Sequence, residues 1–225
     1  MPASIIEQTE VLLGLGLCDD WRFEEALRDR SGCSVVCFDH TVNTKFWVKL
    51  FASNTLNIAK GTRSWGSLLR YLEYRRFFSS RDKIHRRQMI GYHGLGGVTL
   101  EDLRAEYGDR RVFFKIDIEG WEYRVISDLP RWGDNLVGLA IEFHDVDLHR
   151  ERISEFIELM KPTHPLVHLH ANNIGGLDPS GDPLAIEATF VRADLIGDVE
   201  DTPKYPIAGL DFPNGAMADP PLTFG

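Results

Sequence analysis

Long apolar runs are missing from this sequence: no stretch of its 225 residues approaches the roughly 20 apolar residues that a membrane-spanning helix needs. Cysteine is scarce, and the three present (Cys18, Cys33 and Cys37) lack the pair spacing of a metal site and the even count of a disulfide framework. The first ten residues contain Glu7 and Glu10 but no basic segment, so they do not resemble a signal peptide. These absences predict a cytoplasmic protein with reduced thiols and no membrane association.

Positive charge is also in short supply. The sequence has 25 lysine and arginine residues against 34 aspartate and glutamate residues, a net charge of −9, which disfavours binding to nucleic acid or to anionic membranes. One segment departs from this balance, because residues 70–87 contain seven basic and two acidic residues, a local charge of +5. A solvated helix face explains such a cluster, and a contact surface for an anionic substrate or carrier is the alternative.

Short apolar segments alternate with amphipathic ones along most of the chain, which predicts alternating strands and helices. The expected strands are residues 10–17, 33–39, 87–92, 112–118, 136–143, 165–171 and 184–191. The expected helices are residues 21–30, 65–78, 99–108, 121–128 and 148–160. Thr99 is the expected N-cap of the third helix, and Gly108 is expected to end it.

This alternation predicts an α/β fold with one doubly wound, mostly parallel sheet. The last two strands are joined by a turn-rich segment without a helical pattern, so we expect them to form an antiparallel hairpin at the sheet edge. Residues 198–225 hold five of the eleven prolines and no helical period, which indicates a C-terminal arm. With no linker elsewhere, residues 1–225 are expected to form one domain.

The segment FFKIDIEGWEYRVI at residues 113–126 places two carboxylates in apolar surroundings. In a strand, Lys115, Asp117 and Glu119 point to one side. Ligands of doubly wound sheets bind beyond the carboxyl ends of the strands, so both carboxylates are expected to line a ligand crevice. The other expected strands also end in glycine or polar residues: Gly14 and Gly16, Asp39, Glu142 and His144, and His168 and His170 followed by Asn172 and Asn173.

The glycines after the first expected strand separate two classes of cofactor. The segment GLGLCDDW lacks the third glycine of the dinucleotide fingerprint, which argues against NAD or FAD. S-adenosylmethionine has no phosphates, and its sulfonium and ammonium groups suit an acidic crevice. Asp39 lies 23 residues after Gly16, near the offset of an acid that holds ribose hydroxyls, although a turn residue is the alternative. The predicted cofactor-binding residues are Gly14, Gly16, Asp39, Asp117 and Glu119.

The segment KIDIEGWEYRVISDL resembles the signature of FkbM-type methyltransferases, an Asp-x-Glu-Gly followed by an acidic residue, here Glu122. VVCFDHT, GYHGLGG, IEFHD and HLHANN are similar to the methyltransferase-like branch of that family, and the resemblance covers roughly residues 10–215. It implies a class I Rossmann-like methyltransferase domain that transfers a methyl group from S-adenosylmethionine, usually to a hydroxyl oxygen. A hydroxyl on a small molecule or glycan is the expected acceptor, and nothing in the sequence indicates which one or the oligomeric state.

Methyl transfer to an alcohol needs a group that takes the hydroxyl proton. We predict that His144 is this base, because imidazole titrates near neutral pH, and that Asp117 orients it or faces the cofactor. Capping of the strand is the alternative for His144. Four further residues are predicted to hydrogen-bond a polyhydroxylated acceptor, with a turn as the alternative for the two asparagines: His168, His170, Asn172 and Asn173.

A metal and two other functional classes stay open at this point. His168 and His170 can join His144 and Asp117 as ligands of a divalent ion, although we do not expect one. A non-catalytic module that binds S-adenosylmethionine is disfavoured by three imidazoles at one rim of the sheet. An NAD-dependent oxidoreductase is disfavoured by the missing third glycine.

Overall fold

A computed structural model describes residues 3–59, 66–197, 204–215 and 218–223 of the chain. Seven strands form the main sheet: β1 (Val11–Leu15), β2 (Ser34–Phe38), β3 (Lys83–Arg86), β6 (Val112–Ile116), β7 (Leu136–Phe143), β8 (Leu166–Ala171) and β9 (Ile186–Val191). The α-helices are α1 (Ala3–Gln8), α2 (Arg22–Ser31), α3 (Thr44–Ala59), α4 (Gly66–Phe77), α5 (Leu100–Tyr107) and α6 (Val146–Met160). Short 3-10 helices are η1 (Glu122–Arg124), η2 (Ile126–Asn135) and η3 (Ala193–Leu195).

The strand order across the sheet is β3-β2-β1-β6-β7-β9-β8. Every pairing is parallel except those of β9, which runs antiparallel to both β7 and β8. Numbered along the chain, the seven strands lie in the order 3-2-1-4-5-7-6, with the last strand inserted antiparallel, which is the arrangement of the class I methyltransferase fold. The predicted fold class and the edge hairpin are therefore confirmed.

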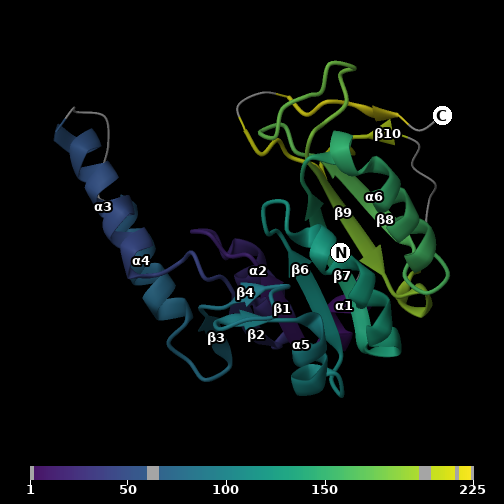
Figure 1. The fold of residues 1–225 in the computed structure, drawn as a ribbon, viewed down its shortest axis with the longest axis horizontal. Coiled ribbons are helices and arrows are strands. Elements are labelled where there is room, and N and C mark those ends of the chain that lie inside the picture. The colour runs from purple at the N-terminus through teal and green to yellow at the C-terminus, as the bar shows by residue number, and fades with distance from the viewer. Residues whose placement is uncertain (1–2, 60–65, 198–203, 216–217, 224–225) are drawn as a thin grey trace.

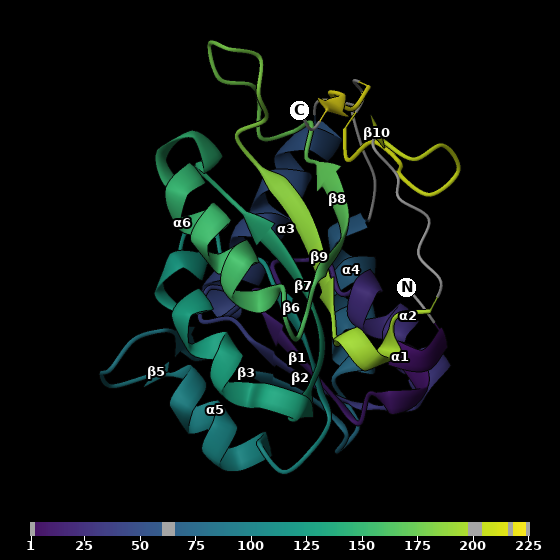
Figure 2. The same cartoon turned by 90° about the vertical axis from the view of Figure 1, so that its right-hand side faces the viewer.

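Helices cover the two faces of this sheet (Figures 1 and 2). Helices α5 and α6 lie on one face and α1 and α2 on the other, and each face has its own apolar cluster. Strand β6 shows the division: Phe114 and Ile116 pack toward α5, whereas Phe113 packs toward α2. Burial on both faces explains the continuous apolar runs of the central strands. Thr99 caps α5 with a reciprocal capping box, and α5 ends at Gly108, as predicted.

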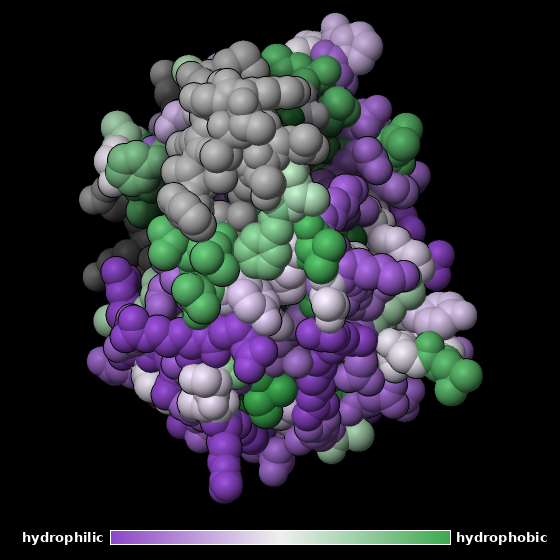
Figure 3. Space-filling view, turned by 90° about the vertical axis from the view of Figure 1, so that its left-hand side faces the viewer, coloured by the Kyte–Doolittle hydropathy of each residue, from purple (hydrophilic) through white to green (hydrophobic). Residues whose placement is uncertain are grey.

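Helices α3 and α4 pack against each other and extend away from the sheet (Figure 1). Trp47 of α3 contacts Tyr71 and Tyr74 of α4. The sequence analysis missed α3, although Asn43 marks its start by accepting hydrogen bonds from the backbone N–H groups of Lys45 and Phe46. Figure 3 views the molecule from this side, where hydrophobic and hydrophilic residues lie beside one another.

Two predicted elements are wrong. The edge strand is β3 (Lys83–Arg86) and not residues 87–92. The sequence pattern did not reveal β3, because a strand at an exposed sheet edge needs few apolar side chains. Residues Met89–Ile90 (β4) pair instead with Gly97–Val98 (β5) in a separate two-stranded sheet. Residues 121–128 form 3-10 turns and not an α-helix. Pro130 lacks the N–H that a continuing helix needs, and Gly133 breaks the helical dihedrals with φ +53°.

The basic stretch of residues 70–87 is partly built into the fold. Arg86 pairs with Glu106 and lies over the ring of Phe38, and Arg70 lies over the ring of Trp21. These contacts support the interpretation as a structural, solvated face for part of the stretch.

The described parts of the C-terminal arm are 204–215 and 218–223, and two short strands, β10 (Lys204–Tyr205) and β11 (Leu222–Thr223), pair within it. The arm lies beside the β8–β9 hairpin (Figures 1 and 2). Within the described residues, the helices are all too short or too polar to cross a membrane.

Candidate functional site

Two pockets meet at the carboxyl ends of the central strands. The small pocket, of about 340 Å³, lies beyond the ends of β1, β2 and β6. The large pocket, of about 1160 Å³, extends over the α2-facing side of β6, β7, β9 and β8 and reaches the C-terminal arm. Leu17, Cys18 and Asp117 line both pockets, so one carboxylate stands at the boundary between them.

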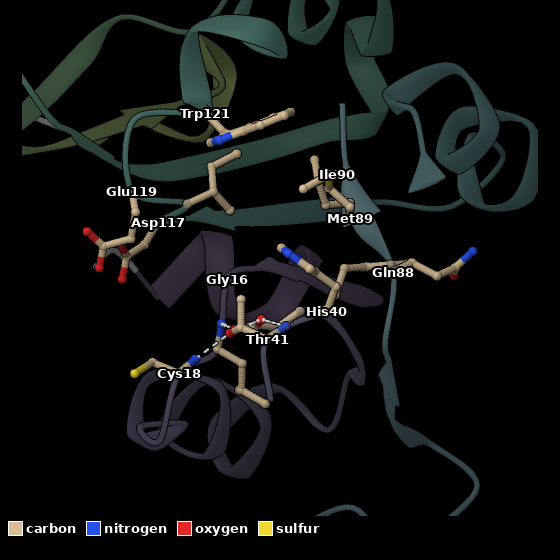
Figure 4. Close-up of a pocket in the computed structure, with 14 residues that line it drawn as sticks. Gly16, Cys18, His40, Thr41, Gln88, Met89, Ile90, Asp117, Glu119 and Trp121 are labelled. Atoms are coloured by element: carbon tan, nitrogen blue, oxygen red, sulfur yellow. Dashed lines mark hydrogen bonds between the residues drawn. The ribbon is translucent and has the colours of Figure 1, made fainter. Parts of the chain in front are cut away.

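The small pocket combines apolar walls with carboxylates (Figure 4). Ile90 and Trp121 supply apolar surface on two sides, and Asp117 and Glu119 lie together at one end. Its lining residues, all within the described part of the chain, include three carboxylates and no lysine or arginine. The apolar walls and the carboxylates therefore suit a flat apolar ring attached to a cationic group. They do not suit a pyrophosphate, which is itself negatively charged.

Gly16 is required by the close approach of β6. It has φ +86°, and a Cβ at this position would lie 1.6 Å from the backbone oxygen of Asp117. Its N–H donates to the oxygen of Phe38, while the N–H of Asp117 donates to the oxygen of Leu15. Gly16 lines the small pocket and allows the loop after β1 to lie against the end of β6, and its contact with a cofactor stays a prediction.

Gly16→Ala is expected to lower the free energy of unfolding by roughly 2–5 kcal/mol, since a left-handed backbone and steric overlap both oppose the side chain. Gly32→Ala is the matched control: Gly32 has φ +72° but nothing within 4 Å of the added Cβ, so only a loss of about 1–2 kcal/mol is expected. Urea unfolding of both variants measures the difference. Equal losses would contradict the steric explanation.

Asp39 ties the loop after β1 to the loop after β2. Its Oδ2 accepts hydrogen bonds from the N–H groups of Leu17 and Cys18, each at 3.0 Å, and its Oδ1 accepts from the N–H and hydroxyl of Thr41. Burial acts to raise the pKa of Asp39, but these hydrogen bonds outweigh burial and lower it. Asp39 lines the small pocket, and its contact with ribose stays a prediction.

Gly14 does not lie where the sequence analysis placed it. It is a buried residue within β1 and lines neither pocket. Its missing side chain leaves room for Glu24 of α2, whose Oε1 lies 3.1 Å from the position of a Cβ on Gly14. Gly14 is therefore a space-making residue under Glu24, and the prediction that it binds the cofactor is not supported.

Lys115 and Asp117 form an ion pair at the boundary of the two pockets. The Nζ of Lys115 lies 3.0 Å from Oδ2 of Asp117, and the Lys115 side chain is 18% exposed. Burial acts to lower the pKa of Lys115, but the charges of Asp117 and Glu24 outweigh it and raise the pKa. The side chains of residues 115 and 117 thus point to the same side, as the strand periodicity predicted.

His144 follows β7 and is surrounded by carboxylates. Its Nδ1 lies 3.2 Å from Oε1 of the fully buried Glu122, which also accepts the backbone N–H of His144 at 2.7 Å. Its Nε2 lies between 3.6 and 3.9 Å from oxygens of three further acids, Asp117, Glu119 and Glu142. Burial acts to lower the pKa of His144, but the hydrogen bond that its Nδ1 donates to Glu122 and the surrounding charges raise the pKa to about 9.

This raised pKa does not favour the predicted role of His144, which stays a prediction. A general base must be unprotonated at the working pH, whereas an imidazole with a pKa of about 9 carries its proton at neutral pH. A protonated His144 balances the negative charge of the carboxylates around it. Asp117 does lie near it, as predicted, but it does not hold the imidazole in a basic form.

Asp117, Glu119 and His144 can together hold a metal ion, because one ligand atom from each lies within 4.8 Å of the others. These are carboxylate and imidazole ligands that divalent ions accept. His168 and His170 do not join this group, so the metal set considered from the sequence is not brought together.

His168 and His170 line the large pocket but are engaged by the C-terminal arm. The Nε2 of His168 lies 2.8 Å from Oδ1 of Asp211, and the Nε2 of His170 lies 3.0 Å from Oδ2 of Asp219. Burial acts to lower the pKa of His170, but hydrogen bonds to Asp219 and Glu187 raise it. The two imidazoles therefore hold the arm over the pocket, and contact with an acceptor stays a prediction.

The two asparagines lie among the contacts of the hairpin and arm and line neither pocket. Asn172 donates to Oε1 of Glu142 at 2.6 Å and accepts the N–H of Ile174, and the side chain of Asn173 accepts the N–H of Gly215 at 2.8 Å. The turn that the sequence analysis kept as an alternative fits Asn172, and Asn173 holds the arm. Their prediction as acceptor-binding residues is not supported.

Sequence reasoning missed the polar residues that face the large pocket from within the fold. Glu24 lies in the first turn of α2, where an acidic residue is normal on a surface helix, so nothing in the sequence distinguishes it. Glu122 lines neither pocket but accepts hydrogen bonds from His144, and the sequence analysis quoted it in the family signature without a role. Lys115 was placed on the correct face, and its partner follows from the two-residue spacing to Asp117.

Comparisons with known proteins give structural likenesses of low similarity. No protein-family model matches the sequence, and no curated protein matches it significantly. The 23S rRNA methyltransferase ErmE has a TM-score of 0.45 at 13% identity over 87% of this chain and 69% of its own. A putative sarcosine dimethylglycine methyltransferase from Galdieria sulphuraria has a TM-score of 0.43 at 10% identity over 85% and 82%. A fibrillarin/Nop5p complex has a TM-score of 0.43 at 10% identity over 82% and 73%. The fold assignment rests on the strand order above and not on these values.

Proposed function

We propose that this protein is an S-adenosylmethionine-dependent methyltransferase that binds the cofactor in the small pocket and the acceptor in the large one. The observation that carries the proposal is the meeting of the two pockets at Asp117, at the carboxyl ends of a sheet with class I methyltransferase strand order. The resemblance of residues 115–129 to the FkbM-type signature supports the same proposal. A hydroxyl on a small molecule or sugar is the proposed methyl acceptor.

The small pocket fits the proposed cofactor. Phe38, Ile90 and Trp121 offer apolar surface to an adenine ring, and Asp117 and Glu119 offer negative charge to the ammonium and sulfonium groups. When bound, S-adenosylmethionine supplies an electrophilic methyl group for an in-line displacement. The absence of lysine and arginine from the described lining disfavours a dinucleotide.

The protein's own groups position the acceptor and take its proton. Glu142 lines the large pocket on the side of Asp117, and its pKa is raised first by burial and then by the charge of Asp117, which makes it a stronger base than an ordinary carboxylate. We propose that Glu142 accepts the proton of the hydroxyl. His144, protonated and 3.7 Å from Oε1 of Glu142, stabilises the carboxylates at the boundary between the pockets.

Thermal unfolding with added ligands tests the cofactor assignment. S-adenosylmethionine and S-adenosylhomocysteine are expected to raise the melting temperature, because a ligand at 100 times its Kd stabilises by about 2.7 kcal/mol, whereas NAD is expected to have no effect. Trp121→Ala is expected to reduce both shifts, and Tyr92→Ala, at an exposed tyrosine outside both pockets, is the matched control. No shift with either adenosyl ligand, or an equal shift with NAD, would overturn the proposal.

A further inference from the structure

The α2-facing side of the sheet is polar where the large pocket lies. Gly14 of β1 pairs with Lys115 of β6, and Lys115 pairs with Ala140 of β7. Two residues further along β7, Glu142 pairs with Glu187 of β9, which pairs with His170 of β8. On the opposite face the same strands carry apolar core residues. Polar residues on an inner sheet face are costly unless they are satisfied, so this floor indicates a binding surface.

Glu24 is the least satisfied group of this floor. The residue is 1% exposed, it lines the large pocket, and neither carboxyl oxygen has a hydrogen-bond partner among the described residues. Burial raises the pKa of Glu24, and the charge of Lys115 acts in the opposite direction. The space that Gly14 leaves places the carboxyl against the floor of the pocket. Because Glu24 has two acceptor oxygens without a donor, a ligand that enters the pocket can supply the donor.

The charges of the pocket select the kind of donor. Three of the carboxylates in the lining already have a basic partner: Asp20 pairs with Arg22, Asp117 with Lys115, and Asp211 with His168. Glu187 and Glu142 lie near His170 and His144. Within the described residues, no ion pair involves Glu24.

We propose that the large pocket binds an acceptor that carries a protonated amino group, such as an amino sugar or amino alcohol, and that Glu24 is the carboxylate that binds this group. The inference rests on the proposed function, in which the large pocket holds the acceptor. An ammonium group offers up to three N–H donors to the two oxygens of Glu24 and adds a positive charge to a pocket in which Lys115 is already paired with Asp117, whereas a neutral hydroxyl offers one donor and no charge.

Matched pairs of probes test the inference: glucosamine against glucose, and ethanolamine against ethylene glycol, each at the same millimolar concentration. The amine of each pair is expected to raise the melting temperature, and the neutral partner is not. Glu24→Gln is expected to abolish the amine shift, while Glu25→Gln, at the exposed neighbour on α2, is expected to retain it. An equal shift with the neutral partners, an amine shift that survives Glu24→Gln, or no shift with any probe would overturn the inference.

A measurement on the unsubstituted protein covers the case in which Glu24→Gln fails to fold. In a carboxyl-carbon NMR titration, glucosamine is expected to lower the pKa of Glu24 and glucose is not, and an unchanged pKa would overturn the inference. The shift with S-adenosylmethionine is measured in the same samples. The melting-temperature shift caused by S-adenosylmethionine is expected to be retained in Glu24→Gln. If the unsubstituted protein shows no such shift, the proposed function is overturned, whatever the result with the amines.

Discussion

Asp117→Asn is expected to lower the free energy of unfolding by about 2–4 kcal/mol, because it leaves the half-buried ammonium of Lys115 without its carboxylate. Among the described residues, Nζ of Lys115 also donates a hydrogen bond to the backbone oxygen of Gly16, at 3.4 Å. Lys115→Met is expected to cost less, because Asp117 is a third exposed and keeps contact with water. Urea unfolding of both variants measures these losses.

The double variant Lys115→Met/Asp117→Asn separates stability from ligand binding. It removes both charges together, so it is expected to recover most of the stability lost in Asp117→Asn. Because Asp117 also lines the small pocket, the melting-temperature shift caused by S-adenosylmethionine is expected to be lost in Asp117→Asn and to remain lost in the double variant. Additive losses in the double variant would contradict the ion pair, and a recovered shift would contradict the placement of the cofactor.

Glu122→Ala is expected to lower the free energy of unfolding by about 3–5 kcal/mol, since it leaves buried donors and a buried imidazolium without their acceptor. The carboxyl accepts the N–H of Gly120 at 2.9 Å through Oε2 and the N–H of His144 through Oε1. It therefore joins the turn after β6 to the end of β7, which carries the imidazole. Glu101→Ala, at an exposed residue of α5, is the matched control and is expected to change stability by less than about 0.5 kcal/mol.

Glu122→Gln tests the charge alone, through the pH dependence of stability. The pKa of His144 in the folded protein, about 9, lies above the ordinary value of 6.5, so its contribution is fully present below about pH 6.5 and is lost as pH rises toward 9. The unfolding free energy is expected to fall by roughly 2–3 kcal/mol over this window, and Glu122→Gln is expected to flatten much of that fall. Urea unfolding at both pH values and NMR titration of His144 check the result. An unchanged slope in Glu122→Gln would show that Glu122 does not hold the proton.

The fold was predictable because it depends on local patterns that the sequence carries. Apolar runs bounded by helical periods located the central strands, and Thr99, as a preferred N-cap residue, located the start of α5. Strand β3 was misplaced because its residues KIHR are half exposed at the sheet edge, so they lack the apolar pattern on which the prediction rests. Helix α3 was missed although its cap, Asn43, is visible in the sequence.

The candidate site was predictable only where a residue's position follows from strand periodicity. That rule placed Asp117 and Glu119 at the small pocket and His168 and His170 at the large one. It could not show that His168 and His170 meet acids 43 and 49 residues further along the chain. Nor could it show that the carboxylates of Glu122, Glu142 and Glu119 raise the pKa of His144, because that value depends on distances between separate segments.

The C-terminal arm sets the access to the large pocket. Ile207, Leu210 and Phe212 line the pocket, and the arm is tied to the hairpin by side-chain contacts of His168, His170 and Asn173. Such contacts break at lower cost than the backbone pairing of the sheet, so the arm can detach while all seven strands keep their register. The size of a molecule that can enter the large pocket then depends on whether these side-chain contacts of the arm are made.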